Sequence, residues 1–236
     1  MTIGNLHIFD FIYFFVWHEY GLAKDRKEIR MGNLLYVTCD LTPVNESSCL
    51  KVGSEFLNEY IKCNPEDEIY MLDLYRDNIQ HIDADVMRGM EKMHSGHHFA
   101  ALAPDEQRKI GRVTNFINQF IAADKYVFVT TTWNLGFPIE LRRYMDTVCV
   151  VSNIYRYTDI FLKNMGRKCL LIHSVNGFES EEKEAISIAY IKSAMRLTGI
   201  EKFEAIAVKG LCSTFEKDKV NINNEIKKVL DAAARF

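Results

Sequence analysis

Short apolar runs alternate with longer amphipathic segments along most of the chain. The short runs are rich in β-branched and aromatic residues, which is typical of buried strands. They span residues 33–38, 68–74, 125–132, 168–174 and 202–208. The longer segments have helical periodicity and span residues 48–62, 104–123, 138–151, 180–198 and 221–234. Because parallel strands need crossover connections, the pattern predicts a doubly wound α/β domain, with a five-stranded parallel sheet and helices on both faces.

Local signals refine this prediction at three places. Ser47 or Ser48 can act as the N-cap of the first predicted helix, and Gly199 suits the end of the helix that precedes it. Residues 77–103 are too long for a plain connection between two elements. We therefore expect them to hold a short helix, together with a segment that serves function or contacts a dimer partner.

Residues 1–30 differ in pattern from the rest of the chain. An aromatic stretch and a charged run precede Met31, where the first strand pattern begins. One interpretation is an additional helix packed on the domain. The favoured interpretation is a translated leader, because the codons of Lys27 and Glu28 can form a bacterial ribosome-binding sequence shortly before Met31. The expected organisation is an N-terminal extension over residues 1–30 and one domain over residues 31–236.

Composition narrows the class of protein. Of the 236 residues, 48% are hydrophobic and 26% are charged, and the net charge of -3 argues against nucleic acid or an anionic membrane as the main partner. The longest apolar run contains Asp10 and is about half of the ~20 residues that a membrane span needs. The six cysteines form no C-x-x-C pair, which is typical of free thiols in a reducing compartment. We expect a cytoplasmic protein.

Candidate chemistry lies in the loops that follow the strands, because doubly wound sheets bind ligands there. No two glycines have the spacing G-x-G and no phosphate-loop motif occurs, which disfavours a Rossmann dehydrogenase and a P-loop NTPase. The loop from Asp40 carries hydroxyl groups into a helix N-terminus at Ser47 and Ser48, where backbone N–H groups favour a phosphate. An ordinary N-cap is the alternative, and the carboxylates of Asp40 and Glu46 would repel a dianion unless they point away.

The loop after the third predicted strand holds Trp133, Asn134 and Phe137. Aromatic and amide side chains at this place suit a planar heteroaromatic ring, although such aromatic residues are more often part of a core or an interface. His94, His97 and His98 form a second cluster that could suggest zinc. No carboxylate or thiol completes a ligand set there, so we expect an exposed polar segment and no metal.

These loops resemble the FMN-dependent NADH-azoreductase and quinone-reductase family. The resemblance covers essentially Met31 to the C-terminus and rests on Trp133-Asn134, Phe137-Pro138, Leu141, Tyr144, Asp146 and Tyr155-Arg156-Tyr157-Thr158. It implies a flavodoxin-like fold, FMN as cofactor, NADH or NADPH as electron donor, and two-electron, ping-pong reduction of quinones and azo compounds. It also implies a homodimer, with Trp133, Phe137 and parts of residues 77–103 expected near the contact.

The resemblance also implies the residues of the cofactor site. The early phosphate contact of the family falls on Asp40, and its serine triplet falls on Ser47, Ser48 and Cys49. Its ring-contacting stretch falls on Thr132, Trp133, Asn134 and Leu135, and its loop after the fourth strand falls on Ser174, Val175, Asn176 and Gly177. Thr132, Leu135, Val175 and Asn176 depart from the residues that are usual in the family. No catalytic side chain is expected, because the flavin carries the reaction.

Two other interpretations remain open from the sequence. One is a related flavin or quinone reductase that uses the same cofactor and another acceptor. The other is a flavodoxin-like binding or regulatory protein whose altered loops no longer retain FMN.

Overall fold

Five parallel strands form one sheet in the computed structural model, which describes residues 32–132, 136–155, 166–175, 181–209 and 216–236. The strands are β1 (Asn33–Cys39), β2 (Glu68–Asp73), β3 (Lys125–Thr131), β4 (Lys168–Val175) and β5 (Lys202–Lys209). Their order across the sheet is β2-β1-β3-β4-β5, and every neighbouring pair is parallel. All five predicted strands are confirmed, each to within one residue at its end.

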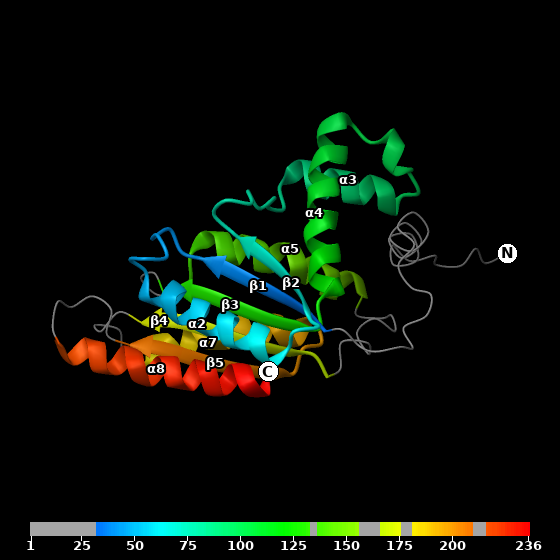
Figure 1. Cartoon of the computed structure of the whole chain (residues 1–236). Helices are drawn as coiled ribbons and strands as arrows, with labels where there is room; N and C mark the ends of the chain where they lie inside the picture. Colours follow the sequence, from blue (N-terminus) through cyan, green and yellow to red (C-terminus); the bar gives the residue numbers. More distant parts are fainter. Residues whose placement is uncertain (1–31, 133–135, 156–165, 176–180, 210–215) are drawn as a thin grey trace.

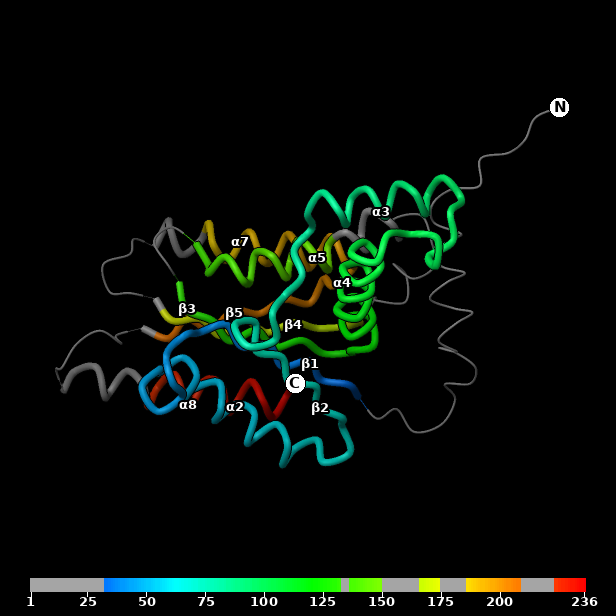
Figure 2. Tube along the Cα trace, turned by 90° about the horizontal axis from the view of Figure 1, so that it is seen from above, coloured from blue at the N-terminus to red at the C-terminus, as the bar shows by residue number. Residues whose placement is uncertain are grey.

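Helices cover both faces of the sheet (Figures 1 and 2). The helices α2 (Ser48–Cys63) and α8 (Glu216–Arg235) pack on one face, and α4 (Pro104–Ala122), α5 (Ile139–Tyr155) and α7 (Glu181–Leu197) lie on the other. The predicted start of the last helix at residue 221 is wrong, because α8 begins at Glu216. Its first residues are Glu-Lys-Asp-Lys, which carry no apolar period that could indicate a helix.

The inner strands are apolar on both sides because helices cover both faces. In β1, Leu35 and Val37 belong to the core beneath α5 and α7, whereas Leu34 and Tyr36 belong to the core beneath α2 and α8. Helix α2 lies so close to the sheet that a Cβ atom at Gly53 would approach Tyr36 Oη to 2.6 Å and Val129 Cγ1 to 2.8 Å. A glycine is therefore needed there, and α2 is held tightly against β1 and β3.

The connection after β2 forms a helical hairpin that projects beyond the sheet (Figure 1). It contains α3 (Ala84–His94), the short 3-10 helix η1 (Phe99–Ala101) and the first half of α4. A small separate core of Val86, Val113 and Ile117 joins α3 to α4. The short helix expected within residues 77–103 is therefore confirmed.

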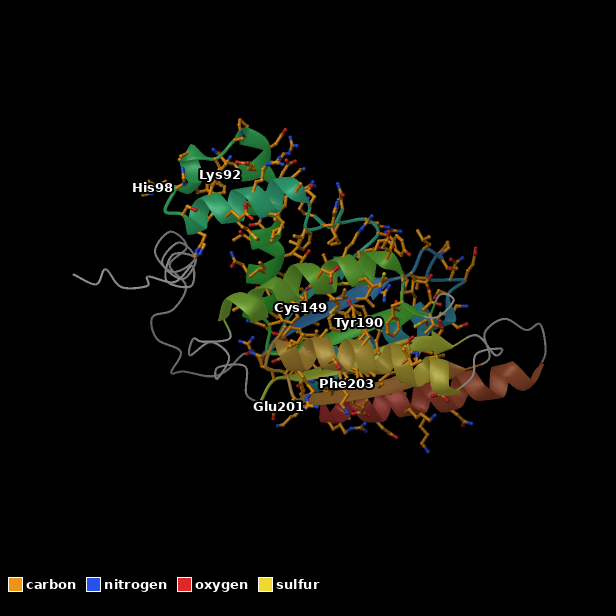
Figure 3. All side chains as sticks on the ribbon, turned by 180° about the vertical axis from the view of Figure 1, so that it is seen from behind. Lys92, His98, Cys149, Tyr190, Glu201 and Phe203 are labelled. Carbon is orange, nitrogen blue, oxygen red and sulfur yellow. The ribbon has the colours of Figure 1, made fainter. Side chains whose placement is uncertain are left out.

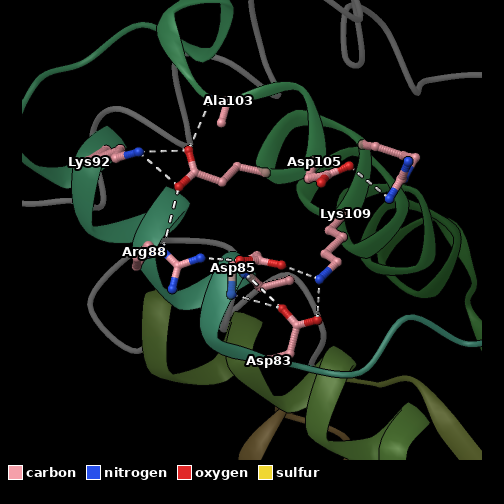
Figure 4. A network of polar contacts seen from close by, with 10 residues as sticks. Asp83, Asp85, Arg88, Lys92, Ala103, Asp105 and Lys109 are labelled. Atoms are coloured by element: carbon pink, nitrogen blue, oxygen red, sulfur yellow. Dashed lines mark hydrogen bonds and ion pairs between the residues drawn. The ribbon is translucent and has the colours of Figure 1, made fainter.

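Ion pairs also join the two arms of this hairpin (Figure 4). Lys109 Nζ lies 2.6 Å from Asp83 Oδ2, and Lys92 Nζ lies 2.8 Å from Glu106 Oε1. Glu106 is only 4% exposed and also accepts a hydrogen bond from the backbone N–H of Ala103. The hairpin is thus fixed by its own charges and its own core.

The helix ends follow the sequence signals. Ser47 is the N-cap of α2, and its hydroxyl oxygen accepts a hydrogen bond from the backbone N–H of Leu50. Gly199 follows α7 with φ of +86°, a left-handed conformation that glycine adopts easily. Within the residues that the structure describes, none of the helices combines the length and the apolar character that a bilayer crossing requires.

Candidate functional site

The candidate site lies where the strand order reverses, between the carboxyl ends of β1 and β3. Cys39 at the end of β1 is in register with Thr130 of β3, so the two strands end side by side. The loop after β1 leads directly into α2. This is the place at which open parallel sheets bind ligands.

Asp40 and Ser47 are joined across the loop between β1 and α2. The Ser47 hydroxyl donates a hydrogen bond of 2.6 Å to Asp40 Oδ2, and the Thr42 N–H donates one of 2.9 Å to Asp40 Oδ1. Ser47 is only 7% exposed. The Asp40 carboxylate is therefore turned into the loop, beside the first turn of α2.

The next two residues face different ways. Ser48 is half-buried, and its N–H belongs to the first turn of α2, where N–H groups have no acceptor within the helix. The Cys49 thiol is buried and points into the sheet, with Sγ 3.0 Å from the Thr130 carbonyl oxygen and 3.6 Å from that of Ile172. Burial, and secondly the negative charge of Asp40, raises the pKa of the Cys49 thiol to about 12. Only the backbone N–H of Cys49 can therefore serve an anion at this helix end.

Hydroxyl groups tie the ends of β3 and β4 together. The backbone N–H and the hydroxyl of Thr132 both donate to the carbonyl oxygen of Ser174, at 3.1 and 3.0 Å. The Ser174 hydroxyl donates to Thr131 Oγ1 at 2.8 Å. Val175 ends β4 and pairs with Lys209 of β5. These bonds fix the separation at which the loops after β3 and β4 leave the sheet.

The remaining predicted site residues lie outside the described residues. They are Trp133, Asn134, Leu135, Asn176 and Gly177. The proposed leader, residues 1–30, lies outside them as well. Asp40, Ser47, Ser48 and Cys49 are brought together at one helix end, and Thr132 and Ser174 are brought together at the neighbouring strand ends.

Phe137, which we expect near the dimer contact, is part of the core of the domain. Its side chain is 6% exposed and packs edge-on against His173 within the domain core, with the ring centroids 6.2 Å apart. It therefore offers almost no surface to a partner chain. Other apolar side chains are exposed near this edge of the sheet, namely Leu41 at 61%, Val44 at 55%, Ile139 at 58% and Ile186 at 66%.

The histidine cluster forms no metal site among the described residues. His94, His97 and His98 are exposed between the last residue of α3 and η1, and His98 is labelled on the hairpin in Figure 3. His97 Nδ1 lies 3.0 Å from the carbonyl oxygen of Lys92. In the part of the chain that the structure describes, no three His, Cys, Asp or Glu side chains come together to hold a metal ion.

Sequence reasoning missed the two pairings that organise the site. Asp40 and Thr42 have the spacing of an Asx turn, and this signal indicates a carboxylate that turns back into its own loop. The pairing of Thr132 with Ser174 had no local signal, because 42 positions separate the two residues.

Comparisons with known proteins decide the family. A family model for the flavodoxin-like fold matches residues 32–232. The FMN-dependent NADH:quinone oxidoreductase of Geotalea uraniireducens is 50% identical over 210 residues, which cover 87% of this chain and 100% of that protein. The protein of the same name from Trichlorobacter lovleyi is 46% identical over the same shares of both chains. The chain belongs to the FMN-dependent NADH:quinone oxidoreductase family.

The fold of this family member also agrees with a solved structure. The azoreductase of Bacillus anthracis superimposes with a TM-score of 0.73, at 23% identity, over 87% of this chain and 100% of that one. The flavodoxin-like, doubly wound α/β fold expected from the sequence is confirmed.

Proposed function

We propose that this protein is an FMN-dependent oxidoreductase that transfers electrons from NADH to quinones and azo compounds. Relatives at 50% and 46% identity are FMN-dependent NADH:quinone oxidoreductases, and the matches cover their whole length. The observation that carries the proposal is a group of N–H and O–H donors that can bind a phosphate at the start of α2, at the point where the strand order reverses. When bound, FMN supplies the two-electron chemistry, accepting hydride from NADH and reducing the acceptor.

The donors at this helix end fit the phosphate of FMN. Ser48 is a half-buried residue with a hydroxyl group, and the backbone N–H groups of Ser48 and Cys49 belong to the first helical turn. The helix dipole adds to the attraction for a negative group at this end. Ser47 contributes by holding the turn, because its hydroxyl already bonds to Asp40 and Leu50. Asp40 does not fit, since its carboxylate bonds to Ser47 and brings a negative charge to the same place.

The ring of FMN is assigned to the loops after β3 and β4. Trp133 would supply an apolar wall, and Asn134 would donate a hydrogen bond to the pyrimidine edge, where negative charge builds up as hydride arrives. Thr132 and Ser174 would keep the two loops at a fixed separation through their paired strand ends. No acid or base side chain is needed for the hydride step, so these residues position and polarise.

Flavin absorbance and its bleaching test the proposal. Protein supplemented with FMN and desalted should keep flavin absorbance near one FMN per chain, NADH should bleach it without oxygen, and a quinone or azo dye should restore it. A colourless protein that shows no binding by flavin fluorescence quenching would favour a binding or regulatory protein. Bleaching that neither a quinone nor an azo dye reverses would favour a reductase with another acceptor.

We also propose that the protein acts as a homodimer in the cytoplasm. Apolar side chains in the loop after β1 and near the starts of α5 and α7 are more than half exposed, and exposed apolar surface of this kind favours an interaction surface at this end of the sheet. The five cysteines that the structure describes are all free thiols, as in a reducing compartment.

A further inference from the structure

The single proton of the Ser47 hydroxyl is already used in a hydrogen bond. That proton is donated to Asp40 Oδ2 at 2.6 Å, while the hydroxyl oxygen accepts the N–H of Leu50 at 3.1 Å. A hydroxyl has one proton to donate. Ser47 therefore has no donor left for a phosphate as long as its bond to Asp40 is intact.

The Asp40 carboxylate accepts hydrogen bonds from neutral groups. Its two oxygens accept only from the neutral donors Thr42 N–H and Ser47 O–H, and among the described residues no lysine, arginine or histidine forms an ion pair with it. The charge reaches the first turn of α2, since it helps to raise the pKa of the Cys49 thiol. A dianionic phosphate at this turn would therefore meet a carboxylate that no cation among the described residues compensates.

We propose that Asp40 is an internal competitor of the FMN phosphate. Its carboxylate occupies the Ser47 hydroxyl and repels the dianion, so that FMN affinity is set by two anions competing for one helix end. The inference rests on the proposed function, because it concerns the same site. The opposite role, in which Asp40 supports binding by orienting Ser47, predicts the opposite sign for loss of the charge.

Asp40→Asn separates these two roles. An asparagine keeps one oxygen for the Thr42 N–H, and its amide nitrogen can donate to Ser47 Oγ, which frees the Ser47 proton for the phosphate. We expect the Kd for FMN to fall about ten-fold at low ionic strength, measured by quenching of flavin fluorescence. The gain should shrink as salt is added, because salt screens the charge that the substitution removes.

Riboflavin and a second variant provide the controls. Riboflavin has the same ring and no phosphate, so its Kd should be equal in the parent protein and in Asp40→Asn. Glu55→Gln removes one charge from an exposed position further along α2. It should change the Kd for FMN by less than about two-fold, because solvent and salt screen a distant exposed charge. Circular dichroism of both variants checks that each is folded.

The outcomes distinguish the inference from the proposed function. If the parent protein binds FMN and Asp40→Asn binds it equally or more weakly, the competitor role is wrong and the proposed function stands. A gain that riboflavin shows as well would also overturn the competitor role, because it would not depend on the phosphate. If neither protein binds FMN, the proposed function and the inference both fail.

Discussion

At the scale of single residues, three neighbours at the start of α2 differ in their contacts because the first helical turn points them in different directions. Ser47 caps the helix, Ser48 is half-buried, and Cys49 points into the sheet. The family resemblance placed all three at the phosphate. Because Ser47 caps the helix and the Cys49 thiol points into the sheet, our proposal leaves the Ser48 hydroxyl and the backbone N–H of Cys49 as phosphate donors.

Substitution by alanine should separate Ser48 from Ser47. Ser48→Ala removes a donor to a charged group, and we expect FMN to bind about 10- to 100-fold more weakly with the melting temperature unchanged. Ser47→Ala removes the N-cap, and we expect the melting temperature to fall by about 2–4 °C, from a loss of ~1 kcal/mol. Flavin titrations and thermal unfolding of the FMN-free proteins measure the two effects. Equal FMN affinity in Ser48→Ala and the parent protein would contradict the phosphate role of Ser48.

At the scale of elements, the α3–α4 hairpin depends on its ion pairs, and this dependence gives it a pH response. The hydrogen bond from Lys109 is the largest of several contacts that lower the pKa of Asp83 from its ordinary value of 3.8 to about 2. A carboxyl group whose pKa is lowered by folding stabilises the folded state above its unfolded pKa. This stabilisation is present above about pH 4 and is lost as the pH falls toward 2.

Asp83→Asn tests this pH response. Asparagine is also a good N-cap, so the bonds that Asp83 accepts from the N–H groups of Asp85 and Val86 can persist while the charge is removed. Lys109 keeps its contact with Asp85 in this variant. We expect the variant to melt about 2–4 °C below the parent protein at pH 7, and the difference to be smaller at pH 3. A difference that is the same at both pH values would show that the charge of Asp83 does not stabilise the hairpin.

At the scale of the whole molecule, the proposed homodimer gives a test of which surface meets the partner. Met87 on α3 belongs to residues 77–103, which the family resemblance places near the dimer contact, and it is 49% exposed. Ile61 near the end of α2 is 45% exposed and lies outside that segment, so it serves as a control of similar exposure. We expect a mass of about twice 27.4 kDa by light scattering, reduced toward the monomer by Met87→Glu and unchanged by Ile61→Glu. A stable monomer that still reduces quinone would rule out a site shared between two chains.

The elements themselves were determined by the sequence. The apolar period located β1 to β5, the length of the connection indicated the helix within residues 77–103, and residue type indicated the caps at Ser47 and Gly199. All of these are local properties of the sequence. Alternation of strands and helices then left a parallel, doubly wound sheet as the consistent arrangement. Two helix ends were predicted wrongly. The first turn of α8 is polar and has no such period, and α5 continues to Tyr155, past its predicted end at residue 151.

Only the tertiary structure decided how the side chains of the site are used. Cys49 and Thr130 are 81 positions apart, and Thr132 and Ser174 are 42 apart, so no local pattern could show that they bond. The hairpin of α3 and α4 likewise projects from the sheet because distant residues form its separate core. A local pattern fixes which backbone forms which element, whereas the direction of a polar side chain depends on the atoms that the folded chain brings beside it.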